Sequence, residues 1–181
     1  MSPLEIGLTK EQRQGIIRLL NQALADTYIL LIKTKKYHWD VVGPQFVTLH
    51  QLWETHYDTL SKSADAIAER TRMLGGYPVG TAAGFLEHTT LREHPGDLPN
   101  AQEMVSRLVV DHEHIIRCLR EGIDRCSDEF HGEGTADFLT ETMKAHEKMA
   151  WMLRSFIEGE DFATVGNRSF YQQDTPVPVG A

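Results

Sequence analysis

Cysteine is scarce in this 181-residue chain, which contains only Cys118 and Cys126. On one helix the eight positions between them correspond to about 12 Å, which is too long for a disulfide within a chain. The sequence also lacks an apolar run of about 18 residues, the length that a membrane span needs. Its first residues, MSPLEIGLTK, lack the apolar core of a signal peptide. We therefore expect a cytoplasmic protein in a reducing compartment.

Basic charge is also scarce, and the formal net charge is −8. The first dozen residues contain one basic side chain, Lys10, and the last twenty-two contain one, Arg168. Lys33, Lys35 and Lys36 form one small cluster, which we interpret as a solvated helix end. An acidic surface repels nucleic acid unless basic residues gather in a patch or tail. We expect DNA binding to be weak or absent, and no association with membranes.

Alternation of apolar and polar residues, the pattern of a strand, persists nowhere in the chain. Apolar residues recur instead at helical spacing, as in Ile16, Leu20 and Leu24. Thr9 followed by Gln12 resembles a capping box. The pattern predicts long helices over residues 9–38, 44–74, 101–127 and 135–159, with a short helix over 81–89. Four long helices and one long connection, residues 79–100, indicate an all-α four-helix bundle with a crossover.

The length suits one domain with one sizeable core. We expect residues 1–181 to form a single domain, with the bundle over about 9–159. The remaining residues, 160–181, end in TPVPVGA and are expected to be an extended tail.

The second predicted helix contains two in-phase pairs of ligand-type residues. With His50 set at 0° and about 100° per residue, Glu54 lies at about 40°, Asp65 at about 60° and Glu69 at about 100°. His38 lies just across the turn that precedes this helix. Carboxylates with imidazole suit iron or manganese, and zinc is also possible. The pattern predicts a metal site.

The spacing of these residues excludes a site within one helix. His50 and Asp65 are fifteen residues apart, which is about 22 Å along the axis. The pairs His50/Glu69 and Glu54/Asp65 share one midpoint, between residues 59 and 60. Two copies of the helix packed antiparallel about a two-fold axis at that point would bring the two ends together. An interface of this kind is isologous and contains two equivalent sites.

These residues resemble the signature of the Dps family, the DNA-binding proteins from starved cells, which are mini-ferritins. The resemblance covers residues 9–158 and is carried by His38-Trp39, Gly43, Phe46, Leu49-His50, Asp65 and Ala68-Glu69-Arg70. It implies a ferritin-like bundle, a hollow dodecamer built of two-fold dimers and a ferric mineral inside. It also implies oxidation of Fe²⁺ at dimer interfaces, often with H₂O₂. Glu54 is a departure, because many members have Asp there.

The family's roles transfer residue by residue. By this resemblance His38, His50 and Glu54 would bind iron from one subunit, and Asp65 and Glu69 would bind it from the two-fold mate. Iron is then substrate and stored cargo, and zinc is a competing occupant.

Two further assignments rest on the same resemblance. Trp39 stands beside a ligand and either relays oxidising equivalents or fills the dimer interface. Asp128, Glu133 and Asp137, between the third and fourth long helices, correspond to a segment that lines a three-fold pore for Fe²⁺. Acidic residues also suit helix N-termini, so the pore is one of two interpretations of this cluster.

The other histidines are given structural or surface roles. No second pair completes a metal site with His112 and His114, so we expect none on that helix. His56 lies on the packing side of its helix and is predicted to be buried or at an interface. Four histidines are predicted to lie on the surface: His88, His94, His131 and His146.

The leading hypothesis is a ferroxidase that stores iron and protects against oxidative stress. One alternative is a DNA-compacting nucleoid protein with little iron chemistry, which the acidic balance disfavours. The other is a bundle with a di-iron site inside each subunit. That design requires repeated Glu-x-x-His pairs, and the sequence contains none.

Overall fold

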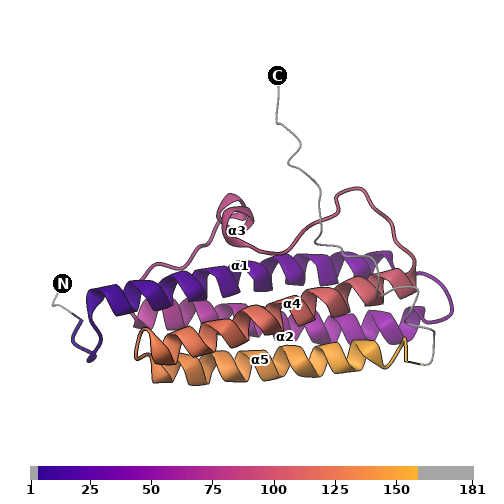
Figure 1. Cartoon of the computed structure of the whole chain (residues 1–181). Helices are drawn as coiled ribbons and strands as arrows, with labels where there is room; N and C mark the ends of the chain where they lie inside the picture. The colour runs from indigo at the N-terminus through magenta and orange to yellow at the C-terminus, as the bar shows by residue number, and fades with distance from the viewer. Residues whose placement is uncertain (1–3, 159–181) are drawn as a thin grey trace, which may run out of the picture.

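The computed structural model describes residues 4–158. Within them the chain is all-α and contains no strand, which confirms the predicted fold class. Four long helices lie side by side: α1 (Lys10–Asp40), α2 (Phe46–Met73), α4 (Ala101–Asp128) and α5 (Glu133–Arg154) (Figure 1). The short helix α3 (Ala82–His88) lies outside the bundle, against α1.

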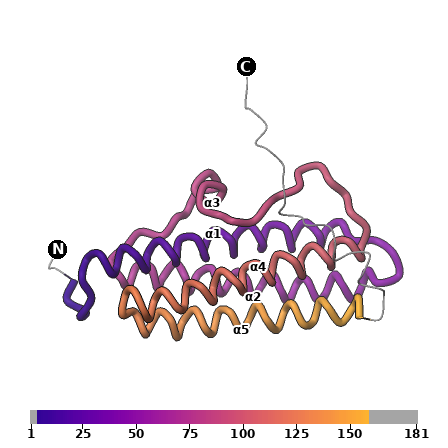
Figure 2. The backbone as a smooth tube through the Cα atoms, in the orientation of Figure 1, coloured from indigo at the N-terminus to yellow at the C-terminus, as the bar shows by residue number. Residues whose placement is uncertain are grey.

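The bundle consists of two antiparallel hairpins. α1 packs mainly against α2, and α4 packs mainly against α5. α1 also contacts α4 and α2 contacts α5, so that α2 and α4 occupy one diagonal of the bundle. The crossover from α2 to α4 runs along the length of the bundle (Figure 2), and α2 and α4 therefore point in the same direction.

The start of α1 and the start of α2 are set by local chemistry. The predicted capping box is present, with Thr9 Oγ1 accepting from the Gln12 N–H and Gln12 Oε1 accepting from the Thr9 N–H. α2 begins at Phe46 rather than at the predicted Pro44. Gly43 has a φ of 105°, which glycine adopts without strain, and residues 43–45 form a turn before the helix.

The last helix differs from its prediction at both ends. α5 begins at Glu133 rather than residue 135, and it ends at Arg154 rather than residue 159. Residues 155–157 continue as a turn that is held by backbone bonds from Phe156 and Ile157 to the preceding turn. The predicted extended tail over 160–181 lies outside the described residues.

The core follows the bundle axis and is formed mainly by leucine, isoleucine and one tryptophan. Trp53 and eleven other large side chains of α1, α2 with its C-cap, and α4 are fully buried, and α5 adds Leu139 and Leu153 to the core. α1 includes an 18-residue window with a mean hydropathy of 1.3, which by length and composition would cross a membrane. Because 61% of that window is buried inside the bundle, packing within the protein accounts for its apolar character.

A buried ion pair connects α1 to α4. Lys33 Nζ lies 2.6 Å from Asp111 Oδ2, and the two side chains are 8% and 5% exposed. The prediction that Lys33 belongs to a solvated helix end is therefore wrong. A pair so deeply buried costs desolvation free energy, and removal of one partner from such a pair is strongly destabilising.

Three histidines lie in the core. His56 and His112 are buried, and His146, predicted to lie on the surface, is fully buried as well. Residues Met143, His146 and Met149 on α5 share one buried stripe at helical spacing, so the signal for burial was present in the sequence. Burial lowers the pKa of His56 and of His146 to about 4 and depresses the pKa of His112, so all three are neutral at pH 7. His88, His94 and His131 are exposed, as predicted.

Candidate metal centre

His38 and His50 lie face to face where α1 ends and α2 begins. Their ring centroids are 3.6 Å apart, and the ring planes differ by 18°. Nδ1 of His38 donates to the backbone carbonyl of His50 at 2.8 Å, and Nδ1 of His50 donates to the backbone carbonyl of His38 at 2.8 Å. The turn between the helices thus holds both rings in one orientation.

These reciprocal bonds determine where each ring carries its proton. A carbonyl oxygen only accepts, so both Nδ1 atoms must be protonated. In a neutral ring Nε2 is then bare, which is the tautomer that a metal ligand needs. The two Nε2 atoms are available for coordination, although His38 as a whole is buried.

Glu54 follows His50 by one turn of α2 and is exposed. Tyr57 lies beside it, with its hydroxyl donating over a long 3.5 Å to Glu54 Oε1 and its ring meeting that of His38 edge-on at 5.3 Å. Desolvation, together with the negative charges of Glu54 and Asp58, raises the pKa of Tyr57, so the hydroxyl keeps its proton. Tyr57 therefore touches two predicted ligands, a role that the sequence analysis missed. Its position one turn after Glu54 on the same helix face is the sequence feature that could have predicted this contact.

Asp65 and Glu69 lie on the same exposed side of α2 but toward its other end. α2 is continuous between them and His50, so the separation of about 22 Å holds in the fold. Among residues 4–158 no three His, Cys, Asp or Glu side chains form a group that would hold a metal ion. One chain thus brings His38 and His50 together, places Glu54 one turn further along α2, and leaves Asp65 and Glu69 apart.

The surface around the histidine pair is apolar. Four exposed apolar side chains flank the histidine pair in the sequence: Trp39, which is 68% exposed, Val42, which is 80% exposed, Phe46 and Val47. The Phe46 ring packs against His50 with centroids 5.0 Å apart. Large apolar side chains gathered next to polar ligand residues are typical of a protein–protein contact surface. The exposure of Trp39 is compatible with both roles predicted for it, the relay of oxidising equivalents and the filling of a dimer interface.

Known proteins resemble this chain over nearly its whole length. Residues 17–161 match the family model of the ferritin-like domain. A low temperature-induced protein of Nostoc sp. is 61% identical, covering 99% of this chain and 100% of its own. The structure of DpsC from Streptomyces coelicolor is 31% identical, covers 98% of this chain and 94% of its own, and has a TM-score of 0.83. The chain belongs to the Dps family. The structure of the Dps protein from Vibrio cholerae O1, described as a member of the ferritin-like diiron-carboxylate superfamily, is 27% identical with a TM-score of 0.80, covering 87% of this chain and 98% of its own.

The acidic cluster of this Dps chain lies at the opposite end of the bundle from the histidine pair (Figure 1). Asp128 ends α4, Glu133 begins α5, and Asp137 follows one turn later, all three exposed. Gly132, the cap of α5, has no side chain to bond the free N–H groups, so Glu133 also complements the helix dipole. A negative charge at Glu133 would serve either role, because it complements the dipole of α5 and would also attract Fe²⁺ to a pore.

Proposed function

We propose that this Dps protein is a ferroxidase and an iron store in the cytoplasm. The observation that carries the proposal is the His38/His50 pair, with both Nε2 atoms bare and Glu54 one turn away. A second copy would supply the missing carboxylates, Asp65 and Glu69, by antiparallel packing of α2 about a two-fold axis. The apolar patch around Trp39 supports contact with that copy. The diiron-carboxylate superfamily of the Vibrio cholerae relative supports iron as the substrate.

The ligand set suits the oxidation of iron. Imidazole nitrogen and carboxylate oxygen both bind Fe²⁺, and anionic carboxylates stabilise Fe³⁺ further, so bound iron is oxidised more readily. Two Fe²⁺ ions pass two electrons to one H₂O₂, which with two protons forms two water molecules. Tyr57 orients Glu54 in this proposal. Zinc would compete for the same ligands.

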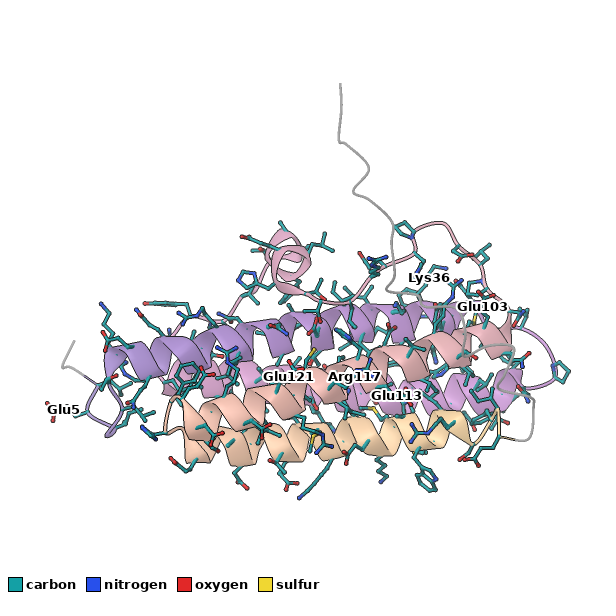
Figure 3. The ribbon with its side chains drawn as sticks, in the orientation of Figure 1. Glu5, Lys36, Glu103, Glu113, Arg117 and Glu121 are labelled. Atoms are coloured by element: carbon teal, nitrogen blue, oxygen red, sulfur yellow. The ribbon has the colours of Figure 1, made fainter. Side chains whose placement is uncertain are left out.

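The exposed charges of the described residues favour iron chemistry over compaction of DNA. Along α4, Glu113, Arg117 and Glu121 follow one another at intervals of one turn (Figure 3), so the signs alternate instead of forming a basic stripe. Arg120 is paired with Glu147 at 3.1 Å. With a net charge of −8, the molecule lacks the charge balance that binding to phosphates requires.

Purified protein given Fe²⁺ and H₂O₂ is expected to oxidise iron faster than buffer and to keep the product in solution. The initial rate, followed by the absorbance of ferric iron and compared between H₂O₂ and O₂, measures the activity and its oxidant. Native mass spectrometry on the same sample is expected to show a dodecamer. Oxidation at the buffer rate by an intact assembly would contradict the ferroxidase proposal.

The acidic cluster at the α4–α5 turn is proposed to line the route by which Fe²⁺ enters. Like charges around a narrow opening concentrate cations and do so less at high salt. Changing Asp128, Glu133 and Asp137 together to Asn, Gln and Asn should slow iron uptake several-fold and reduce its dependence on salt. A matched control changes Glu113, Glu121 and Asp124 of α4 in the same way, which removes the same charge elsewhere. Equal uptake by both variants would leave the cluster with a helix-end role alone.

A further inference from the structure

Two buried histidines join the last two helices of the bundle. His112 of α4 and His146 of α5 are both 0% exposed, and their Nδ1 atoms lie 3.0 Å apart. His56 of α2 lies next to the pair, with its ring edge-on to that of His112 and 6.2 Å between the centroids. The contact between α4 and α5 therefore includes a hydrogen bond between two ionisable rings in the core.

This hydrogen bond has room for one proton. One Nδ1 donates and the other accepts, so the two neutral rings are different tautomers. The Nε2 atoms of both rings are buried and find no hydrogen-bond partner among the described residues. Buried polar atoms without a partner are rare in native proteins, because they destabilise the fold. Two apolar side chains would fill the same space without this loss of stability.

The contact cannot persist when both rings are protonated. The first added proton binds the bare Nε2 of the donor ring, where the described residues offer it no acceptor. The second converts the acceptor ring, so that two Nδ1–H groups, both donors, would face each other at 3.0 Å. The hydrogen bond is then lost, and two like charges lie in the core. α4 and α5 must separate at this point to let water reach the rings.

The charged groups around the pair do not offset a positive charge on it. Three carboxylates are adjacent to these histidines in the sequence, and each already has a cation of its own. The ion pairs are Glu113–Arg154, Glu147–Arg120 and Asp111–Lys33. Burial, together with the nearby His146 and His56, depresses the pKa of His112, and burial lowers the pKa of His146 to about 4. Both rings are therefore neutral as long as the helices stay packed near pH 7.

We propose that the His112–His146 contact is an acid-sensitive switch, which holds α4 against α5 while the rings are neutral and opens the bundle when they are protonated. In the opened chain each ring meets water and takes up a proton near its ordinary pKa of about 6.5. The stability that the neutral pair provides is fully present above that pH and is lost as the pH falls toward about 4. Opening would release stored iron in acid, a consequence that rests on the function proposed above, whereas the switch itself does not depend on iron.

The test is urea unfolding of the iron-free, full-length assembly at fixed protein concentration, followed by helical circular dichroism across this range of pH. Between about pH 6 and pH 5 the pair should raise the ratio of unfolded to folded subunits roughly fifty-fold, about sevenfold for each histidine. In His112→Leu/His146→Leu the rise should be smaller by that factor. Near pH 7 this variant should be about as stable as the wild type, because replacing both partners of a buried hydrogen bond by apolar groups is nearly neutral.

The comparison isolates the pair, because His56 and the interface histidines are present in both proteins and their titration cancels. The matched control is His88→Leu/His131→Asn, which removes two exposed histidines and should keep the wild-type dependence on pH. Asn suits position 131, where φ is 51°. An equal dependence on pH in the wild type and in the core variant would overturn the proposal. Should the core variant fail to fold, the wild type decides, and a rise well below fifty-fold between about pH 6 and pH 5 would overturn it as well.

Discussion

Assemblies made from equal amounts of His50→Ala and Asp65→Ala chains are expected to regain about a quarter of the wild-type rate of iron oxidation. Each variant alone should lose about tenfold or more of the rate, because every site in its assembly lacks one ligand. In a mixed dimer one site carries both lesions. The other site takes His50 from one chain and Asp65 from the other, and it is whole. Random pairing makes half of the dimers mixed, and each of these has one intact site of two.

A second mixture is the matched control for this experiment. His50→Ala and Glu54→Ala both affect the same half of the proposed site, so no pairing of these chains produces an intact one. This mixture should recover nothing, whereas the first recovers a quarter. Native mass spectrometry of chains with distinct masses must show full co-assembly in both. Full mixing without recovery in the His50/Asp65 pair would contradict the shared site, even if the wild-type protein oxidises iron.

Replacing Lys33 with Met is expected to lower the free energy of unfolding by about 3–5 kcal/mol. The change removes the ammonium group that lies 2.6 Å from the carboxylate of Asp111, which is 5% exposed between α1 and α4. A loss of this size corresponds to a decrease in Tm of roughly 10 °C for a chain of this length. Thermal and urea unfolding at fixed protein concentration measure it. The iron-oxidation rate of the folded variant should be unchanged, since Lys33 contacts Asp111 of α4 whereas His38 contacts His50 of α2.

The double variant Lys33→Met/Asp111→Leu is the control, because it removes both charges and fills the same space with apolar groups. Replacing a buried pair in this way is often neutral. We expect it to recover most of the lost stability. A double variant as unstable as Lys33→Met would show that packing at this position, rather than loss of the ion pair, determines the decrease in stability. Lys36→Met, one turn toward the surface on α1, should change stability by less than about 1 kcal/mol.

The sequence predicted the bundle and the candidate ligands through periodicity, which is a local property. Glu54 one turn after His50 on one helix face follows from about 100° per residue in any α-helix. The antiparallel two-fold arrangement also came from spacing, and the continuous α2 retains that spacing. It remains a proposal, since one chain cannot contain an intersubunit site.

The stacking of His38 on His50 could not be predicted from the sequence. It depends on the path of residues 41–45 between two helices, where Gly43 takes a positive φ and the ring of each histidine reaches the backbone of the other. Periodicity describes single helices and contains no information about the direction of such a turn. The contact of Tyr57 with His38, which joins α2 to the end of α1, depends on the same turn.

The polar residues of the core also separate what the sequence determines from what the tertiary structure decides. By itself the sequence determined which helices form and which side of each is apolar, because these follow from the repeat of the helix. The tertiary structure alone decided that Lys33 meets Asp111 and that His112 meets His56 and His146. These partners are 34 to 78 positions apart in the sequence, and each pair joins different helices. Their pairing depends on how the helices are rotated and shifted against one another, which side-chain packing sets only when the whole bundle assembles.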